Sequence, residues 1–99
     1  MKRFDTEEME SGGLSLVLEP SANWEQFPSV SKRWAQKLNA QCLSQPVVTI
    51  DECVLEVKIS SGYFWITYDD YQSAIQLEPR EKKYNDIILA LQKELLNNT

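Results

Sequence analysis

The residues best suited by type and spacing to do chemistry are Asp69, Asp70 and Glu78, with Tyr71 beside them. Neighbouring carboxylates can bind a hard cation or act as a general acid and base. An Asp-Asp pair at the end of a strand is equally ordinary turn chemistry. The segment has no EF-hand spacing and no supporting glycine, so it specifies no metal ligand and no catalytic residue. The four residues stand as candidates for a ligand site.

The absence of histidine excludes several classes of enzyme. Ser-His-Asp and Cys-His catalysis both need an imidazole to take the proton from the nucleophile. The common zinc sites lack ligands, since Cys42 and Cys53 are the only cysteines. Gly12, Gly13 and Gly62 form no phosphate-binding loop. We therefore expect no cofactor and favour a role other than catalysis, while chemistry by carboxylates, lysine or tyrosine alone stays open.

The charge and the cysteines indicate the kind of partner and compartment. Fifteen acidic and ten basic residues give a net charge of -5, and the basic residues are scattered rather than clustered as phosphate binding requires. Cys42 and Cys53 form no CxxC motif and are expected to be reduced thiols. The sequence shows neither a secretory signal nor the ~20 apolar residues of a spanning helix. We expect a cytoplasmic protein with no nucleic-acid or membrane partner.

Tyr63 and Trp65, in the run YFWITY, are the candidates for a protein contact. Period-two alternation places Phe64, Ile66 and Tyr68 on one face of a strand and these two residues on the other. If the first set packs under helices, Tyr63 and Trp65 lie on an open sheet face that suits protein recognition. Two alternatives remain: aromatic pairs stabilise neighbouring strands without a partner, and a one-residue register shift exchanges the faces.

The hydrophobic pattern defines the elements that must position these residues. Period-two alternation predicts strands over residues 14–19, 47–50, 53–60, 63–68 and 74–77. Apolar residues spaced by helical turns predict helices over residues 23–39 and 80–96. Ser61-Gly62 is the predicted hairpin turn, with Gly62 supplying positive φ. Pro28 is placed in the first turn or at a bend of the first helix, and Pro79 near the start of the second.

The element order β-α-β-β-β-β-α predicts an α+β fold. Strands joined by short turns are antiparallel neighbours, and both helices must bury their apolar stripes. We expect a two-layer sandwich in which two helices cover one face of an antiparallel sheet of four to five strands. Residues 14–99 form this single domain. Residues 1–13 are polar and acidic and are expected to be a flexible leader.

The stretch from Tyr63 to Pro79, YFWITYDDYQSAIQLEP, followed by an amphipathic helix, is the distinctive part of the chain. It resembles a family of small uncharacterised bacterial proteins of about this length. The earlier segment WEQFPSVSKRWAQKL is compatible with the layout of that family. The resemblance implies a domain of unknown function and carries no activity to any residue.

These observations favour a non-enzymatic cytosolic protein-interaction or accessory domain. It would use a sheet face or an exposed strand edge, and a second copy of the chain is one candidate partner. The alternative is a small-ligand or metal-binding domain, or a carboxylate-dependent enzyme, at the acidic turn of residues 69–78.

Overall fold

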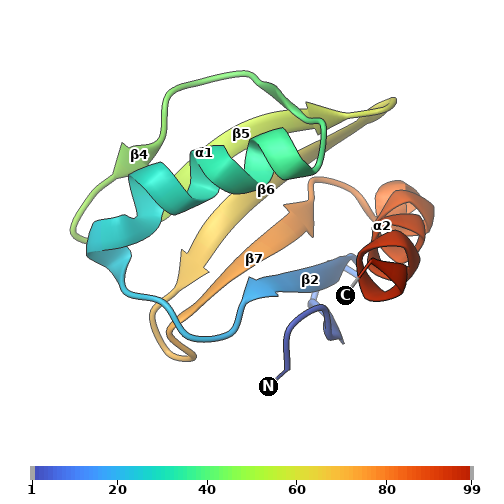
Figure 1. Cartoon of the computed structure of the whole chain (residues 1–99), viewed down its shortest axis with the longest axis horizontal. Helices are drawn as coiled ribbons and strands as arrows, with labels where there is room; N and C mark the ends of the chain where they lie inside the picture. The colour runs from blue at the N-terminus through green and yellow to red at the C-terminus, as the bar shows by residue number, and fades with distance from the viewer. Residues whose placement is uncertain (1, 99) are drawn as a thin grey trace.

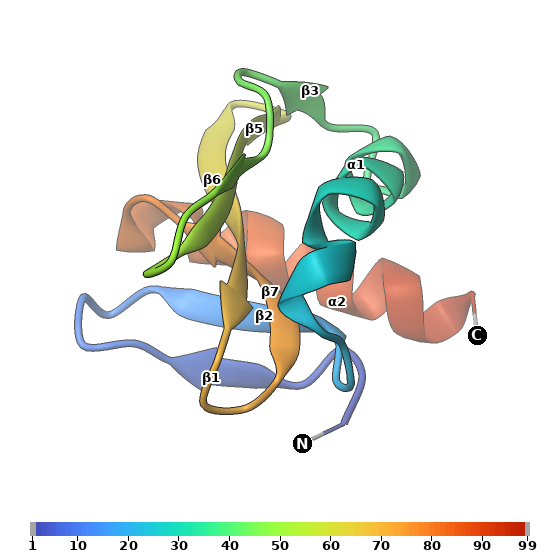
Figure 2. The same ribbon diagram turned by 90° about the vertical axis from the view of Figure 1, so that its left-hand side faces the viewer.

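An antiparallel sheet with two helices on one face makes up residues 2–98, the part of the chain that the computed structural model describes (Figures 1 and 2). The strands are β1 (Thr6–Glu8), β2 (Leu14–Glu19), β3 (Gln41–Cys42), β4 (Val47–Val48), β5 (Cys53–Ile59), β6 (Gly62–Asp69) and β7 (Ala74–Pro79). They lie in the order β1-β2-β7-β6-β5-β3, and β4 also pairs with β5. The helices are α1 (Phe27–Lys37) and α2 (Asn85–Asn97), preceded by the 3₁₀ turns η1 (Trp24–Gln26) and η2 (Lys82–Tyr84).

Period-two alternation in β5 and β6 decides which face the helices cover. Leu55, Val57, Phe64 and Ile66 are all buried in one core with residues of both helices, among them Ile88 of α2. Side chains one position along each strand point to the other face. The predicted α+β class is confirmed, and of the two facings that the sequence left open for β6, the one with Phe64 and Ile66 in the core is observed.

The sheet has seven strands where four to five were predicted, because two short strands gave no pattern. The strand β1 contains only Thr-Glu-Glu and pairs with β2, and β3 contains only Gln-Cys and pairs with β5. A run of two or three residues is too short to show alternation, so these two strands are recognised only by their backbone pairing with neighbouring strands. The order is therefore β-β-α-β-β-β-β-β-α.

Both helices begin later than predicted. Asn23 caps η1 by accepting a hydrogen bond from the Gln26 amide, and Pro28 lies in the first turn of α1, where its missing N–H costs nothing. Pro79 ends β7 instead of starting a helix. The Arg80 amide donates to the Tyr63 carbonyl at 3.0 Å and so prolongs the strand pairing beyond the proline.

The β5–β6 hairpin turns at Ser60-Ser61, one residue earlier than predicted, since Ile59 pairs with Gly62. Ser60, with φ 54°, takes the left-handed conformation that had been assigned to the glycine. Gly62 is needed for space instead. A Cβ there would lie 2.8 Å from Phe64 Cε1 and 2.9 Å from Ile87 Cδ1.

The substitution Gly62→Ala is therefore expected to lower the free energy of unfolding by about 1–3 kcal/mol, because the added methyl overpacks the contact between β6 and α2. Urea denaturation measures the change, with Ser61→Ala, on an exposed neighbour, as the matched control. Equal stability of the two variants would show that the contact yields freely and that the packing argument is wrong.

Phe4 connects the N-terminal segment to both layers. Its amide donates to the Val17 carbonyl at 2.7 Å, and its carbonyl accepts from Gln92 Nε2 at 2.9 Å. Its ring is buried and meets Trp34 edge to face at 5.9 Å between centroids. Glu19 accepts from Trp34 Nε1 and pairs with a neighbouring arginine, Arg3. The segment expected to be a leader thus joins β2, α1 and α2, while its flexibility in solution stays a prediction.

Replacing this ring tests how firmly the segment is held. The substitution Phe4→Ala is expected to cost about 3 kcal/mol of stability, because a buried aromatic side chain is lost from the core. Urea denaturation again provides the measurement, and Glu7→Ala, on an exposed residue of the same segment, is the control. A loss no larger than that of the control would favour a leader that moves freely in solution.

Candidate functional site

The face of the sheet away from the helices brings Tyr63 and Trp65 together with charged residues. We call it the open face and define it by Glu56, Lys58, Tyr63, Trp65, Thr67, Glu78 and Arg80. In the register of β5, β6 and β7, Tyr63 lies opposite Lys58, and Trp65 lies between Glu56 and Glu78. Tyr63 is 38% exposed and Trp65 is half-buried. Two aromatic rings thus lie among side chains of both charges.

Arg80 covers these two rings, a contact that sequence reasoning missed because Arg80 was assigned to a helix. Its guanidinium carbon lies 5.3 Å from the centroid of the Trp65 ring and 5.8 Å from that of Tyr63, within reach of a cation–π interaction. Its Nη2 donates to Glu56 Oε2 at 2.7 Å. Within residues 2–98, the buried Nε has no hydrogen-bond partner, so the rings and Glu56 hold the guanidinium.

The four residues of the predicted acidic site all line one hollow of about 650 Å³, which also includes Glu56, Trp65 and Thr67 of the open face. Asp69 Oδ1 accepts from the amides of Tyr71 and Gln72, which is the hydrogen bonding of an Asx turn, and its Oδ2 contacts Gln76 Nε2 at 3.5 Å. Tyr71 is 97% exposed. Glu78 accepts from Thr67 Oγ1 at 2.6 Å, on the open face. Among the residues that the structure describes, no three of His, Cys, Asp and Glu are placed to hold a metal ion.

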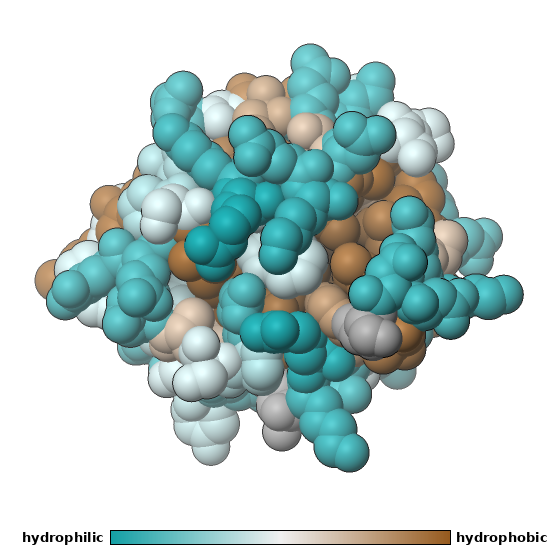
Figure 3. All heavy atoms as spheres, viewed as in Figure 1, coloured by the Kyte–Doolittle hydropathy of each residue, from teal (hydrophilic) through white to brown (hydrophobic). Residues whose placement is uncertain are grey.

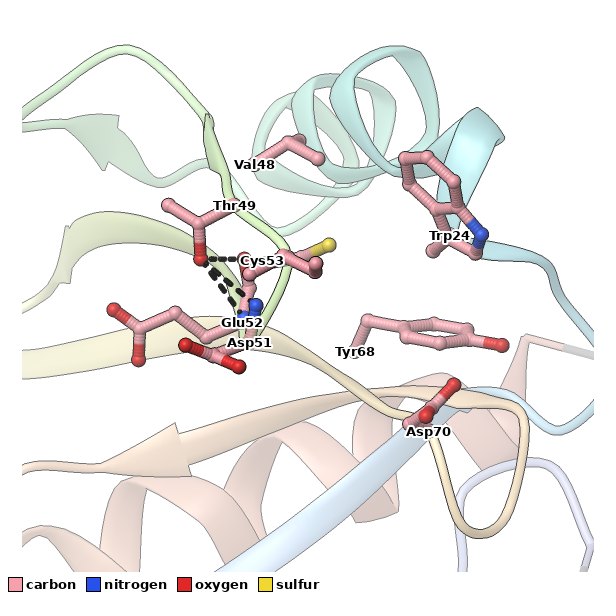
Figure 4. A pocket seen from close by; sticks show the side chains of 9 residues that line it. Trp24, Val48, Thr49, Asp51, Glu52, Cys53, Tyr68 and Asp70 are labelled. Atoms are coloured by element: carbon pink, nitrogen blue, oxygen red, sulfur yellow. Dashed lines mark hydrogen bonds between the residues drawn. The ribbon is translucent and has the colours of Figure 1, made fainter.

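Asp70 also lines a second pocket, of about 520 Å³, at one end of the sheet (Figure 4). We call this the Trp24 pocket. Its walls come from η1, β6 and the turn that joins β4 to β5, namely Trp24, Val48, Thr49, Ile50, Asp51, Glu52, Cys53, Tyr68 and Asp70. Asp70 is one of the candidates from the sequence, whereas Trp24 falls within the predicted helix of residues 23–39. In the structure Trp24 is 52% exposed and belongs to η1.

Local hydrogen bonds fix the walls of the Trp24 pocket. Thr49 Oγ1 accepts from the amides of Asp51 and Glu52 and donates to the Glu52 carbonyl, which closes the turn (Figure 4). The Tyr68 hydroxyl donates to the Ala22 carbonyl at 3.3 Å. The carboxylates at the rim therefore come from an ordered turn, and the tyrosine ring is tied to the segment that leads into η1.

A third hollow, of about 460 Å³, lies between the end of α1 and α2. Its apolar lining is Leu38, Ile59, Leu91 and Leu95, and its polar lining is Lys37, Asn39, Ser60, Glu94 and Asn98. Figure 3 shows hydrophobic side chains gathered between the two helices on this side of the molecule. Lys37 and Glu94 carry opposite charges, whereas the Trp24 pocket is lined by carboxylates and aromatic rings without a cation.

With this geometry established, comparison with known proteins gives a family but no activity. A family model described as Protein of unknown function (DUF3630) matches residues 4–97. The chain belongs to this family. No curated protein and no solved structure matched in the other two comparisons. The match confirms the predicted resemblance to a domain of unknown function, while the bacterial origin that the resemblance implied stays a prediction.

The matched region of this DUF3630 chain includes Phe4, the open face and the Trp24 pocket. Across residues 2–98, neither helix has the length and apolar character needed to cross a membrane.

Cys53 is the one thiol among the residues that line the Trp24 pocket, and its surroundings favour the protonated form. It is 5% exposed. Burial raises the pKa of its thiol above the ordinary value of 9.0, and the negative charges of Asp70 and Glu52 raise it further. Cys42 pairs with Val57 of β5, four residues from Cys53. This separation is ~13 Å along the strand, too far for a disulfide.

The raised pKa makes a prediction about thiol reactivity. In a Cys42→Ser background, alkylation of Cys53 by iodoacetamide is expected to rise with pH through an apparent pKa above 9.0. Asp70→Asn is expected to lower that pKa, since removing a nearby negative charge favours the thiolate. Mass spectrometry measures the rates, and Asp86→Asn, which removes an equal charge from α2, is the control. An unchanged pKa in Asp70→Asn would contradict the coupling.

Proposed function

We propose that this chain is a non-enzymatic, cytoplasmic protein-interaction or accessory domain and that the open face is its contact surface. The observation that carries the proposal is the contact of Tyr63, Trp65 and Arg80 on one face of the sheet. Tyrosine, tryptophan and arginine are the residue types enriched at the energetic centres of protein interfaces. Because Arg80 is already held by Glu56, binding a partner costs less side-chain entropy at this position.

The open face suits a partner better than the strand edges do. At one edge, β1 is three residues long and exposes Glu7 and Glu8, and short charged edges oppose pairing with another strand. At the other edge, β5 is already paired with β3 and β4, and its Glu56 carbonyl accepts from the Leu43 amide. Few backbone groups are left for strand addition.

The charges of the open face favour a partner with a mixed polar surface. Lys58 and Arg80 flank Tyr63, which lies two residues before Trp65 on β6, and Glu78 lies opposite Trp65 on β7. Such an arrangement fixes the orientation of a partner more than it adds affinity. A second copy of the chain meets this requirement, since it carries both charges, so self-association is part of the test.

The alternative function, binding of a small ligand, is favoured by one observation, the Trp24 pocket. It receives less support at the acidic turn itself, because Asp69 and Glu78 already accept hydrogen bonds within the domain.

The proposal predicts that Trp65→Ala weakens binding of a partner by about 30-fold or more while the fold is kept, since loss of a central interface residue costs at least ~2 kcal/mol. The wild-type domain is used to capture proteins from a lysate of its source organism, and each captured protein is then titrated against wild type and variant. Sedimentation velocity measures self-association of the wild type and of Trp65→Ala.

Trp24→Ala is the matched control, because it removes an exposed aromatic ring that lies outside the open face and outside the hollow that Trp65 lines. Circular dichroism verifies the fold of both variants. A partner that binds Trp65→Ala as tightly as wild type would overturn the assignment of this face. Unfolding of Trp65→Ala would make Trp65 a structural residue and would remove it from the proposed contact.

A further inference from the structure

The Trp24 pocket shares its carboxylates with the neighbouring hollow of about 650 Å³, but of the two only the Trp24 pocket includes Trp24. In Figure 4, Trp24 lies above Tyr68 across the pocket, and Cys53 lies to one side of both rings. The exposed face of an aromatic ring attracts cations. Half of the Trp24 surface is exposed although it lines a concave site. The volume of about 520 Å³ is in the range of small-molecule sites.

The charge around the Trp24 pocket is negative and uncompensated. Asp51, Glu52 and Asp70 line it, and no lysine or arginine does. The ion pairs formed by the described part of the chain join Arg3 to Glu19, Arg80 to Glu56 and Lys83 to Glu81. None of them neutralises a carboxylate of the pocket. A positively charged group entering between the two rings would find both π faces and a countercharge.

Cys53 gives a second, independent sign that the pocket is a built site. Its thiol is more than nine-tenths buried, faces the space between Val48 and Trp24, and forms no hydrogen bond in the structure of residues 2–98 (Figure 4). Its neutral form leaves the floor of the pocket apolar. An alkyl chain is the complement of such a floor, and a cationic head group is the complement of the rim.

We propose that the Trp24 pocket binds an alkylammonium group, with Trp24 and Tyr68 contacting the cation and Asp70 supplying the nearest countercharge. Ammonium attached to a flexible alkyl chain fits because Cys53 and Val48 accept the chain while the rings accept the charge. The group can come from a free amine or from a lysine side chain. This inference does not rest on the proposed function of the open face.

The test follows the three tryptophan indole N–H signals by NMR while Nα-acetyl-lysine methylamide is added. The norleucine analogue, which keeps the alkyl chain and lacks the charge, is added in parallel. The lysine compound is expected to shift the Trp24 signal alone, with a dissociation constant in the millimolar range, and the analogue is expected to leave it unmoved. Trp24→Ala identifies the signal by its loss.

Variants locate the site. Because Trp24→Ala removes the indole signal, binding to the variants is followed through a second NMR signal, that of the Tyr68 hydroxyl or of a backbone amide of the pocket. Trp24→Ala is expected to weaken binding about fivefold or more, as loss of one cation–π contact predicts. Asp70→Asn is expected to weaken it about threefold, as loss of one exposed charge pair predicts. Asp86→Asn is the charge-matched control, and Trp65→Ala is expected to bind normally, which separates this result from the open-face test.

The same titration with butylammonium distinguishes the two sources of the group. Tighter binding of the lysine compound supports recognition of a protein side chain, and equal or tighter binding of butylammonium supports a free amine. The proposal is overturned if neither amine shifts the Trp24 signal up to the solubility limit. It is equally overturned if the norleucine analogue binds as well, or if Asp70→Asn and Asp86→Asn behave alike.

Discussion

The register of the β5–β6 hairpin is the constraint on which the rest of the structure depends. Once Ile59 pairs with Gly62, every side chain of the two strands is assigned to a face. Phe64 and Ile66 then lie in the core, and Trp65 lies on the open face opposite Glu56. A shift of one residue would bury the charged row and expose the apolar one. The Ser60-Ser61 turn and the close contact at Gly62 both hold this register.

Both helices pack on the apolar face that this register creates, and the N-terminal segment contacts both helices and β2. Phe4 contacts Trp34 of α1, accepts a hydrogen bond from Gln92 of α2 and donates one to β2. Both helices lie on the same side of the sheet (Figure 2), and the open face is on the other side. The polar and aromatic residues there are therefore positioned by a core to which they do not belong, and their side chains are available for contact.

Two adjoining surfaces meet at the end of β6. Asp69 accepts hydrogen bonds from its own turn, while Asp70 lines both the hollow beside the open face and the Trp24 pocket. On the open face, Arg80 and Glu56 compensate one another beside the aromatic rings. In the Trp24 pocket the carboxylates have no such partner. The first surface suits a protein of mixed charge, and the second suits a small cationic group.

The sequence by itself determined the α+β class and most element positions, because periodicity is a local consequence of burying one face. It also excluded histidine-dependent chemistry. Only the tertiary structure decided which face of β6 the helices cover, the pairing of β1 and β3, the contact of Arg80 with Trp65, and the placing of Trp24 and Tyr68 on one pocket. Those contacts join residues far apart in the chain, and no local pattern of side chains encodes which distant segments come together.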